Sequence, residues 1–535
     1  MTVMLPILVA QLSTAGITFI NTTMAGHAGS EDLAGVSVGA GLFYPILASI
    51  IGLLMAGTPL MAQLLGKKRK DELPGIVRTG LVIGFSIFAL FTLSYFLGID
   101  ALLAHMALEA EVAHIARYYL MAMIGVVFFI ALVIPLRCLT DTAGSTSLSM
   151  KLFLLAPPVN GIFNYLFIYG HLGLPAMGGI GTGIATMVTY GFLFLLFLTV
   201  VMKSRGLMGK EIFTSFSIRK SDLKEYLMVG VPSGMSIFME MSLFSVIILF
   251  LAKYGTDALA AYQIADNFAS LVFMIPVSCS MALTILVATA AGAGDMELVR
   301  RYKKAGLVAA LLGASMTAGL TVLFNESIGK VYTGDADVIA IAGQFLIYSA
   351  GWQIFDAIST PIQGILRGLK DTRVSFFLMV IAYWGGCFPM SLFLDNEMAM
   401  GADSYWLGLV FGVGCSAFFM ILRLIYVERV LDGKWVPDMA YILSFFGRER
   451  KAVRPVLSLA TAESSRSMAE TQRQLKDFLS FLAKMEKRTA ALIQMINEAE
   501  IDIYIENRPV IPIRMAKLAD LHRIIVGHAT RAYVP

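Results

Sequence analysis

Three acids with the potential to bind a cation, Glu240, Asp266 and Asp356, lie deep within long apolar stretches of the second half of the chain. An ionised carboxylate at the middle of a bilayer costs about 2.5–3.5 kcal/mol by insertion scales. No Lys or Arg lies at similar depth in the same stretches. Acids kept at such a cost usually hold a cation that moves. The residue types and their depth therefore predict a cation site in the C-terminal half.

Each of these acids also has a structural interpretation. Glu240 and Asp356 could pin neighbouring helices through buried hydrogen bonds, although two uncompensated acids in one bundle are hard to explain as scaffolding. Asp266 lies about two helical turns from the outer end of its stretch, where water can reach it, so a structural role is an equal alternative. Asp141 and Asp371 follow arginines at helix ends, where capping or ion pairing suffices.

The elements that must position these acids are membrane helices. Of the 535 residues, 57% are hydrophobic and 15% are charged, and the mean hydropathy is +0.76. A crossing helix needs about 20 mainly apolar residues. Twelve stretches reach that length, near residues 4–26, 34–65, 74–98, 114–138, 148–170, 178–202, 225–253, 258–291, 304–325, 338–366, 373–394 and 405–428. The composition excludes a soluble fold and predicts an all-α membrane protein with twelve transmembrane helices.

Basic residues gather in alternate loops, which predicts the orientation in the membrane. They lie at positions 67–70, 137, 203–224, 300–304, 367–373 and 423–434. Since Lys and Arg in short loops stay in the cytoplasm, both ends of the bundle are expected there. The first apolar stretch begins at Val3 without the basic segment of a signal peptide, so we expect no cleavable signal.

Charge and motifs exclude several other functional classes. The net charge is +4, and the basic residues form no continuous stripe, so we expect no nucleic-acid partner. The four cysteines are far apart and form no CxxC or Cys/His group, which argues against a metal or disulfide framework. HExxH, GxSxG and a nucleotide-binding loop are missing, so we expect neither an enzyme nor a bound cofactor.

The two halves of the chain repeat each other. Pro6 and Pro232 lie in similar contexts, as do the segments that start at Gly29 and Gly255, and both pairs are 226 residues apart. Because each half has an even number of crossings, the halves share one orientation and are related by a pseudo-two-fold axis along the membrane normal. The predicted domains are an N-terminal six-helix bundle, a cytoplasmic linker, a C-terminal six-helix bundle and a soluble cytosolic tail, at residues 1–210, 211–224, 225–431 and 432–535.

Several motifs resemble a known transporter family. The segments are FINTTMAG at 19–26, NYLFIYGHLGLPAMGGIGTGIAT at 164–186 and ILRGLKDTRVSFFLMVIAYWGGCFPMSLFL at 365–394. They are similar to the multidrug and toxic compound extrusion (MATE) family, in its NorM-like bacterial branch, over about residues 1–431. The resemblance implies a secondary active antiporter in the bacterial inner membrane that exports amphipathic, often cationic drugs in exchange for Na⁺ or H⁺. Composition and spacing alone predict only a two-bundle secondary transporter.

The resemblance also implies roles for particular residues of the C-terminal bundle. The acid of the family's helix-seven FxE element corresponds to Glu240, and the helix-ten acid corresponds to Asp356. In NorM-like relatives these acids, with an aromatic residue four positions before the second, form the cation site, so Na⁺ is a candidate ligand of Glu240 and Asp356. The aromatic position is Trp352 here, which lacks a hydroxyl oxygen. Asp266 stands where an apolar residue is expected and is predicted to be an added ligand.

The N-terminal bundle departs from the family pattern. Relatives commonly carry an Asp in helix one, where this chain has Asn21, which does not titrate in the physiological range. Asn21, Asn160, Asn164 and Asp141 are expected to supply oxygen ligands or a hydrogen-bond network. Aromatic residues suited to a plastic cavity for planar cations are Phe43, Tyr44, Phe238, Tyr262 and Trp352.

The coupling ion and the function class each have alternatives. Loss of water disfavours a charged carboxylate, which suits protons, whereas carboxylates with neutral oxygens suit Na⁺; the missing helix-one acid favours Na⁺. A flippase for lipid-linked precursors or polysaccharide is the alternative function. It would need a cationic cavity, whereas the deep charges here are acidic.

The last hundred or so residues differ from the rest of the chain. Apolar residues recur at helical spacing from Ser464 to Glu500, residues 501–506 and 510–513 alternate as short strands, and a final helix is predicted over 516–526. This tail is either a native appendage for dimerisation or regulation, or an engineered fusion partner. The transport unit itself is expected to be monomeric.

Overall fold

The structure, a computed structural model, describes residues 2–106, 108–214, 218–431, 502–505 and 508–512. Within these ranges twelve helical segments are long and apolar enough to cross a membrane, which confirms the predicted number. The chain divides into two compact units, Met1–Leu424 and Ile425–Pro535. The first unit contains both halves of the predicted repeat.

The first six membrane segments are continuous or broken helices. They are α1 (Met4–Ala28), α2 (Ser30–Leu54) with α3 (Gly57–Gly66), α4 (Leu73–His105), α5 (Ala110–Leu139) with the π-helical η2 (Thr140–Gly144), α6 (Thr146–Leu154) with α7 (Ala156–Tyr169), and α8 (Gly179–Lys203). The fifth segment, predicted as one helix, is interrupted at Leu155, just before Pro157 and Pro158. Proline lacks the N–H that would continue the helical ladder. Short helices η1 (Lys70–Glu72), η3 (Arg205–Leu207) and α9 (Gly209–Thr214) lie in the loops.

The other six segments follow the same plan. They are α10 (Lys220–Leu251) with η4 (Ala252–Tyr254), α11 (Thr256–Gly292), α12 (Met296–Leu323), α14 (Ala336–Gly368), α15 (Thr372–Val380) with the π-helical η5 (Ile381–Cys387) and α16 (Phe388–Asn396), and α17 (Asp403–Leu431). Helix α13 (Asn325–Tyr332) lies between α12 and α14. The predicted linker, 211–224, includes the end of α9 and the start of α10. The exact domain boundaries stay predictions.

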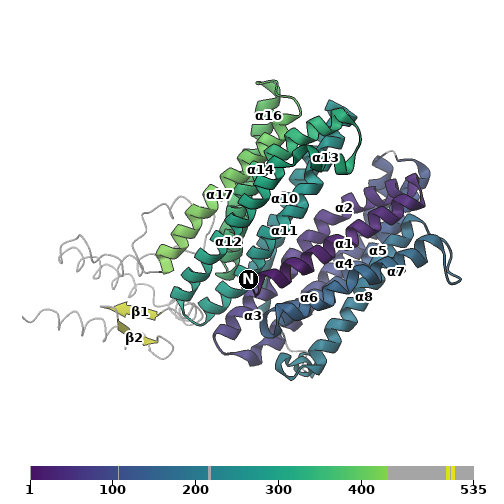
Figure 1. Ribbon diagram of the computed structural model, residues 1–535. Coiled ribbons are helices and arrows are strands. Elements are labelled where there is room, and N and C mark those ends of the chain that lie inside the picture. Colours follow the sequence, from purple (N-terminus) through teal and green to yellow (C-terminus); the bar gives the residue numbers. More distant parts are fainter. Residues whose placement is uncertain (1, 107, 215–217, 432–501, 506–507, 513–535) are drawn as a thin grey trace, which may run out of the picture. The chain divides into compact units, whose positions relative to one another are not determined.

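Helices pack mainly against others of their own half. In the N-terminal half α5 packs against α8, α2 and α4, and in the C-terminal half α14 packs against α11 and α12. Figure 1 shows α1 to α8, in purple to blue, grouped apart from α10 to α16, in teal to green. The predicted all-α fold of two six-helix bundles is confirmed.

The two bundles meet through α1, α2 and α3 on one side and α10 and α11 on the other. Tyr226 donates from its hydroxyl to the Leu54 carbonyl at 2.5 Å, and Gln63 Nε2 donates to the Gly368 carbonyl at 2.9 Å. Two glycines, Gly66 and Gly292, allow backbone-to-backbone contact here, since a Cβ on either would overlap a carbonyl of the other bundle. These contacts lie close to the basic loops 67–70 and 367–373.

The second unit contains a two-stranded antiparallel hairpin of β1 (Asp502–Ile505) and β2 (Arg508–Pro512). The two short strands predicted from alternation are therefore confirmed. The helices predicted at 464–500 and 516–526 lie outside the described residues.

Candidate cation and substrate site

Glu240 on α10 and Asp356 on α14 come together inside the C-terminal bundle, where their carboxylates are close enough to interact electrostatically. The hydroxyl of Tyr383, on the π-helical η5, donates to Glu240 Oε1 at 3.2 Å, and this residue is also within electrostatic range of Asp356. The exposed fractions of Glu240, Asp356 and Tyr383 are 9%, 1% and 1%. Sequence reasoning paired the two acids but missed Tyr383.

Neither acid has a basic partner among the described residues. Asp356 Oδ1 accepts a hydrogen bond from Thr360 Oγ1 at 2.6 Å, while Asp356 Oδ2 is buried without any hydrogen-bond partner. Asp371 and Asp395, by contrast, are paired with Arg423 and Lys253. A buried carboxylate without a counter-charge must take up a proton or a cation. This pair can therefore bind and release a small positive ion.

Trp352 lies one turn before Asp356 on α14, on the same helix face, as the spacing of four predicts. Its ring packs against Phe273 of α11, with the ring centroids 5.7 Å apart. Trp352, Gln353 and Asp356 line a cavity, about the size of one water molecule, between α11, α12 and α14. Sequence reasoning also missed Gln353, although an amide three residues before Asp356 in an apolar stretch was a signal for it.

Asp266 on α11 is half-buried and lies apart from the pair. It lies within electrostatic range of the hydroxyl of Tyr262, one turn earlier on the same helix, and no interaction among the described residues joins it to Glu240 or Asp356. The structure therefore gives no contact that makes Asp266 a shared ligand, and that role stays a prediction.

Three of the four predicted N-terminal residues form one buried network. Asn164 Nδ2 donates to Asn21 Oδ1 and to Asn160 Oδ1, each at 2.8 Å. Asn21 Nδ2 donates in turn to Thr186 Oγ1 at 2.9 Å, and Asn160 Nδ2 to Thr189 Oγ1 at 3.4 Å. The three asparagines are at most 4% exposed. The network holds α1, α7 and α8 together without a titrating group, and it leaves Asn164 Oδ1 buried without a hydrogen-bond partner.

Asp141 is not part of this network. It lies in η2, where its carboxylate is 3.4 Å from Arg137 Nε, and it lines a small cavity between the bundles together with Arg367 of α14. Its position at the junction of the two bundles separates it from the asparagines in the interior of the first bundle.

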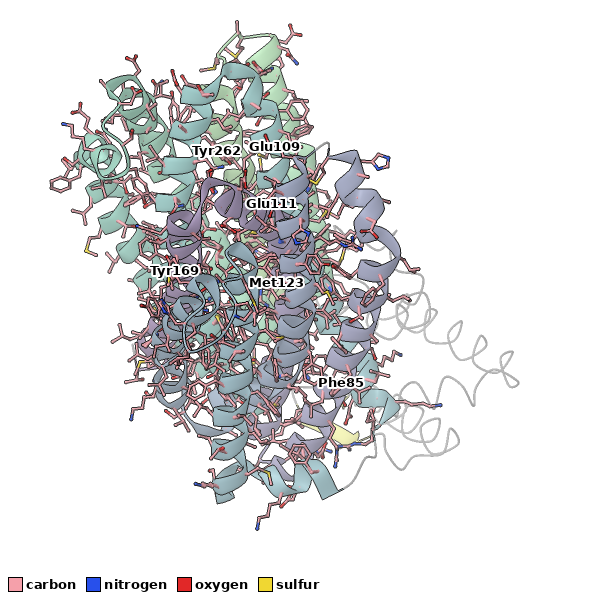
Figure 2. The ribbon with its side chains drawn as sticks, turned by 90° about the vertical axis from the view of Figure 1, so that its right-hand side faces the viewer. Phe85, Glu109, Glu111, Met123, Tyr169 and Tyr262 are labelled. Atoms are coloured by element: carbon pink, nitrogen blue, oxygen red, sulfur yellow. The ribbon has the colours of Figure 1, made fainter. Side chains whose placement is uncertain are left out.

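The predicted cavity aromatics do not share one environment. Tyr262, labelled in Figure 2, is fully buried on α11 with its ring 5.6 Å from that of Trp406 and its hydroxyl unpartnered. Trp352 is 5% exposed, whereas Phe238 on α10 is half-buried and Tyr44 on α2 is 37% exposed. Phe43, beside Tyr44, is 1% exposed. Only Tyr44 and Phe238 of these five have substantial accessible surface for a substrate, and their role stays a prediction.

Comparison with known proteins identifies the family. The sequence model of the MatE family matches residues 6–166 and again residues 232–392, so the two matches begin 226 residues apart, as the internal repeat does. The chain is 38% identical over 435 residues to the probable multidrug resistance protein NorM of Geobacillus kaustophilus, covering 81% of this chain and 95% of the relative. It is 36% identical over 431 residues to the corresponding protein of Halalkalibacterium halodurans, covering 80% and 94%.

Solved structures share the fold. An outward-facing MATE transporter of the MOP superfamily has a TM-score of 0.74 at 17% identity, covering 81% of this chain and 95% of that one. The eukaryotic MATE transporter AtDTX14 has a TM-score of 0.73 at 19% identity, covering 79% and 94%. With the double match of the family model and relatives above 30% identity over four fifths of its length, the chain belongs to the multidrug and toxic compound extrusion (MATE) family.

Proposed function

We propose that this multi-pass membrane protein is a secondary active multidrug efflux antiporter of the bacterial cell membrane. It exports amphipathic, often cationic compounds in exchange for Na⁺ or H⁺. The observation that carries the proposal is the pair Glu240 and Asp356, buried in the C-terminal bundle without a basic partner among the described residues. The names of the NorM relatives, as probable multidrug resistance proteins, support the substrate class.

The exchange runs by alternating access. Substrate enters from the cytosol or inner leaflet while the acids are free of the ion; binding of the ion from outside then disfavours the substrate and biases the arrangement of the bundles. One charge moving down 100 mV supplies about 2.3 kcal/mol. Differential affinity of the ion for the two arrangements converts this free energy into a shifted population. The transport unit is a monomer, with the basic ends of both bundles in the cytoplasm.

A flippase for lipid-linked precursors fits the site less well. A pyrophosphate headgroup needs cationic partners, whereas the buried charges in the C-terminal bundle are Glu240, Asp356 and Asp395. The buried Arg137 of the other bundle lies against Asp141. The charge of the site thus favours a cationic cargo.

Imposed gradients test the proposal directly. In proteoliposomes that contain the purified protein, we expect ethidium transport when either a Na⁺ gradient or a pH gradient is imposed alone, and loss of that transport when an ionophore collapses the effective gradient. Protein-free liposomes treated in the same way are the control. Ethidium transport at the same rate with and without the gradients would contradict the antiport function. A lack of ethidium transport under both gradients would contradict it as well.

The glycine contact between the bundles gives a second prediction. A methyl group on Gly66 or Gly292 would overlap backbone atoms of the opposite bundle, and overpacking of this kind costs about 1–3 kcal/mol. Gly66→Ala and Gly292→Ala should therefore disfavour the arrangement seen here by roughly 5- to 150-fold and slow ethidium efflux from cells. Gly41→Ala on α2, where a Cβ meets no atom within 4 Å, should leave efflux unchanged. Equal efflux in all three variants would show that this contact is dispensable.

A further inference from the structure

One face of α11 carries polar side chains that are exposed within a membrane-spanning segment. Gln263, Asn267 and Ser270 are exposed and recur at helical spacing, and Asp266 lies next to them, half-buried. Asp266 has no basic partner in the described part of the chain. Charged and polar side chains in a membrane helix face other helices or a water-filled space, and not lipid. These four residues, the polar face of α11, therefore border a polar environment.

The polar face points towards the N-terminal bundle. Met281 and Ile285 lie eighteen residues, about five helical turns, after Gln263 and Asn267, so they occupy the same side of α11. Both pack around Ile7 of α1, in the N-terminal bundle. One side of α11 is therefore covered by the N-terminal bundle near the basic loops, while the same side is exposed closer to the start of the helix.

The internal repeat gives α2 a matching exposed face. The positions 226 residues before the three exposed residues of α11 are Ser37, Gly41 and Tyr44, and all three are exposed as well. Met55, eighteen residues after Ser37 and on the same side of the chain, lines the small cavity between the bundles together with Met281. The exposed faces of α2 and α11 thus border one opening between the bundles, on the side away from the basic loops.

The chemistry of the polar face suits an organic cation better than a metal ion. Asp266 is a single carboxylate, and no three His, Cys, Asp or Glu side chains gather anywhere in the described part of the chain. A small metal ion needs several oxygen ligands around it, whereas a bulky organic cation needs one negative charge and an apolar or aromatic surface. Tyr44, which is 37% exposed on the matching face of α2, supplies an aromatic ring to the same opening.

We propose that the polar face of α11 binds the cationic head of the exported compound, with Asp266 as its charged partner. This docking site for the cargo is separate from the buried pair of Glu240 and Asp356, to which no interaction in the described part of the chain joins Asp266. The inference rests on the proposed function for its biological meaning, but its first test measures the binding of a cation without any gradient.

Equilibrium binding of ethidium to the purified full-length protein, at constant pH in one detergent, tests the charged partner. Asp266→Asn should raise the dissociation constant for ethidium about tenfold, because it removes a charge contact at the edge of an apolar interior. Asp266→Glu should retain binding, and the uncharged dye Nile red should bind Asp266→Asn and the wild type equally. Asp257→Asn, at an exposed acid in the first turn of the same helix, is the matched control.

Two results of this binding experiment would overturn the proposal. One is wild-type affinity for ethidium in Asp266→Asn, which would show that the carboxylate does not contact the cation. The other is an equal loss of ethidium and Nile red binding, which would show that the substitution disturbs the fold and does not remove a charge contact.

The concentration dependence of ethidium efflux from cells separates docking from coupling. Asp266→Asn should raise the ethidium concentration that gives half-maximal efflux and keep the maximal rate within about twofold of the wild type. A lower maximal rate at an unchanged half-maximal concentration would assign Asp266 to coupling and overturn the inference. Either result leaves the antiport function standing, because that function fails only when imposed gradients do not drive transport.

Thiol labelling tests whether the polar face borders water. Gln263→Cys should react with a charged, membrane-impermeant methanethiosulfonate added outside the cell, and saturating ethidium should protect it. Val308→Cys, on α12 at a side chain that is 57% exposed, is the control for a lipid-facing position and should react no faster than the wild type, whose own cysteines are buried or half-buried. Gln263→Cys that reacts as slowly as Val308→Cys would place the polar face against lipid and overturn the proposal.

Discussion

Asp356→Asn is expected to abolish gradient-driven ethidium efflux. The substitution keeps the size of the side chain and its bond from Thr360, but it removes the only charge at the small cavity and the group that interacts with Glu240. Loss of one coupled charge removes about 2.3 kcal/mol of driving free energy at 100 mV. This corresponds to about a fortyfold decrease in the ratio of ethidium concentrations that the protein can maintain across the membrane. Glu240→Gln should also reduce efflux strongly, because Tyr383 then bonds to a neutral amide.

Asp337→Asn is the matched control for this prediction. Asp337 is an exposed residue in the first turn of the same helix, α14, so its change should leave efflux at the wild-type rate. The measurement is ethidium efflux from cells, with equal amounts of each variant in the membrane. Normal efflux in both Asp356→Asn and Glu240→Gln would show that the acid pair is scaffolding, the structural alternative.

The features predictable from sequence are those that depend on distance along one helix or on composition. Twelve crossings follow from the length of apolar stretches, and the position of Trp352 beside Asp356 follows from the spacing of four. Glu240 and Asp356 could be paired because both are acids without a counter-charge. Their pairing in the structure depends on α10 and α14 lying in one bundle, which the repeat and the family resemblance indicated.

Features that depend on how helices are rotated against one another were not predictable. Tyr383 reaches Glu240 from the π-helical η5, and a change of helix type shifts every later side chain around the axis. Gln353 points its oxygen at the cavity because of a hydrogen bond to Thr321 of another helix. Sequence spacing does not contain either of these relations.

The segment LRCLTDT at residues 136–142 recurs as LRGLKDT at residues 366–372, yet the two copies make different contacts. In the N-terminal copy Asp141 lies 3.4 Å from Arg137, its own neighbour one turn back. In the C-terminal copy Asp371 instead accepts two hydrogen bonds from Arg423 of α17, at 2.6 and 2.9 Å. Arg367, the arginine of the C-terminal copy, lines the cavity between the bundles beside Asp141. A motif therefore predicts which residues are charged, while the packing of the other helices decides which of them pair.

Asp395→Asn is expected to destabilise the C-terminal bundle strongly. Its carboxylate, on a side chain 5% exposed, accepts from Lys253 Nζ at 2.5 Å, from Tyr405 Oη at 2.9 Å and from the hydroxyl of Tyr254. These donors tie η4, which follows α10, and the start of α17 to α16. Hydrogen bonds to a charged group contribute about 1.5–3 kcal/mol each; because Lys253 is half-exposed, we expect a total loss of about 2–3 kcal/mol.

The matched control is Asp100→Asn. Asp100 also pairs with a basic residue, Arg117 at 3.2 Å, but the two side chains are 68% and 49% exposed. Exposed pairs contribute about 0–1 kcal/mol, so this variant should unfold close to the wild-type temperature. The measurement is thermal unfolding of both purified variants in the same detergent. The donors around Asp395 are three side chains from two elements, η4 and α17, whereas Asp100 pairs with one arginine. Equal shifts of the unfolding temperature in the two variants would contradict the prediction that the buried carboxylate contributes more to stability than the exposed one.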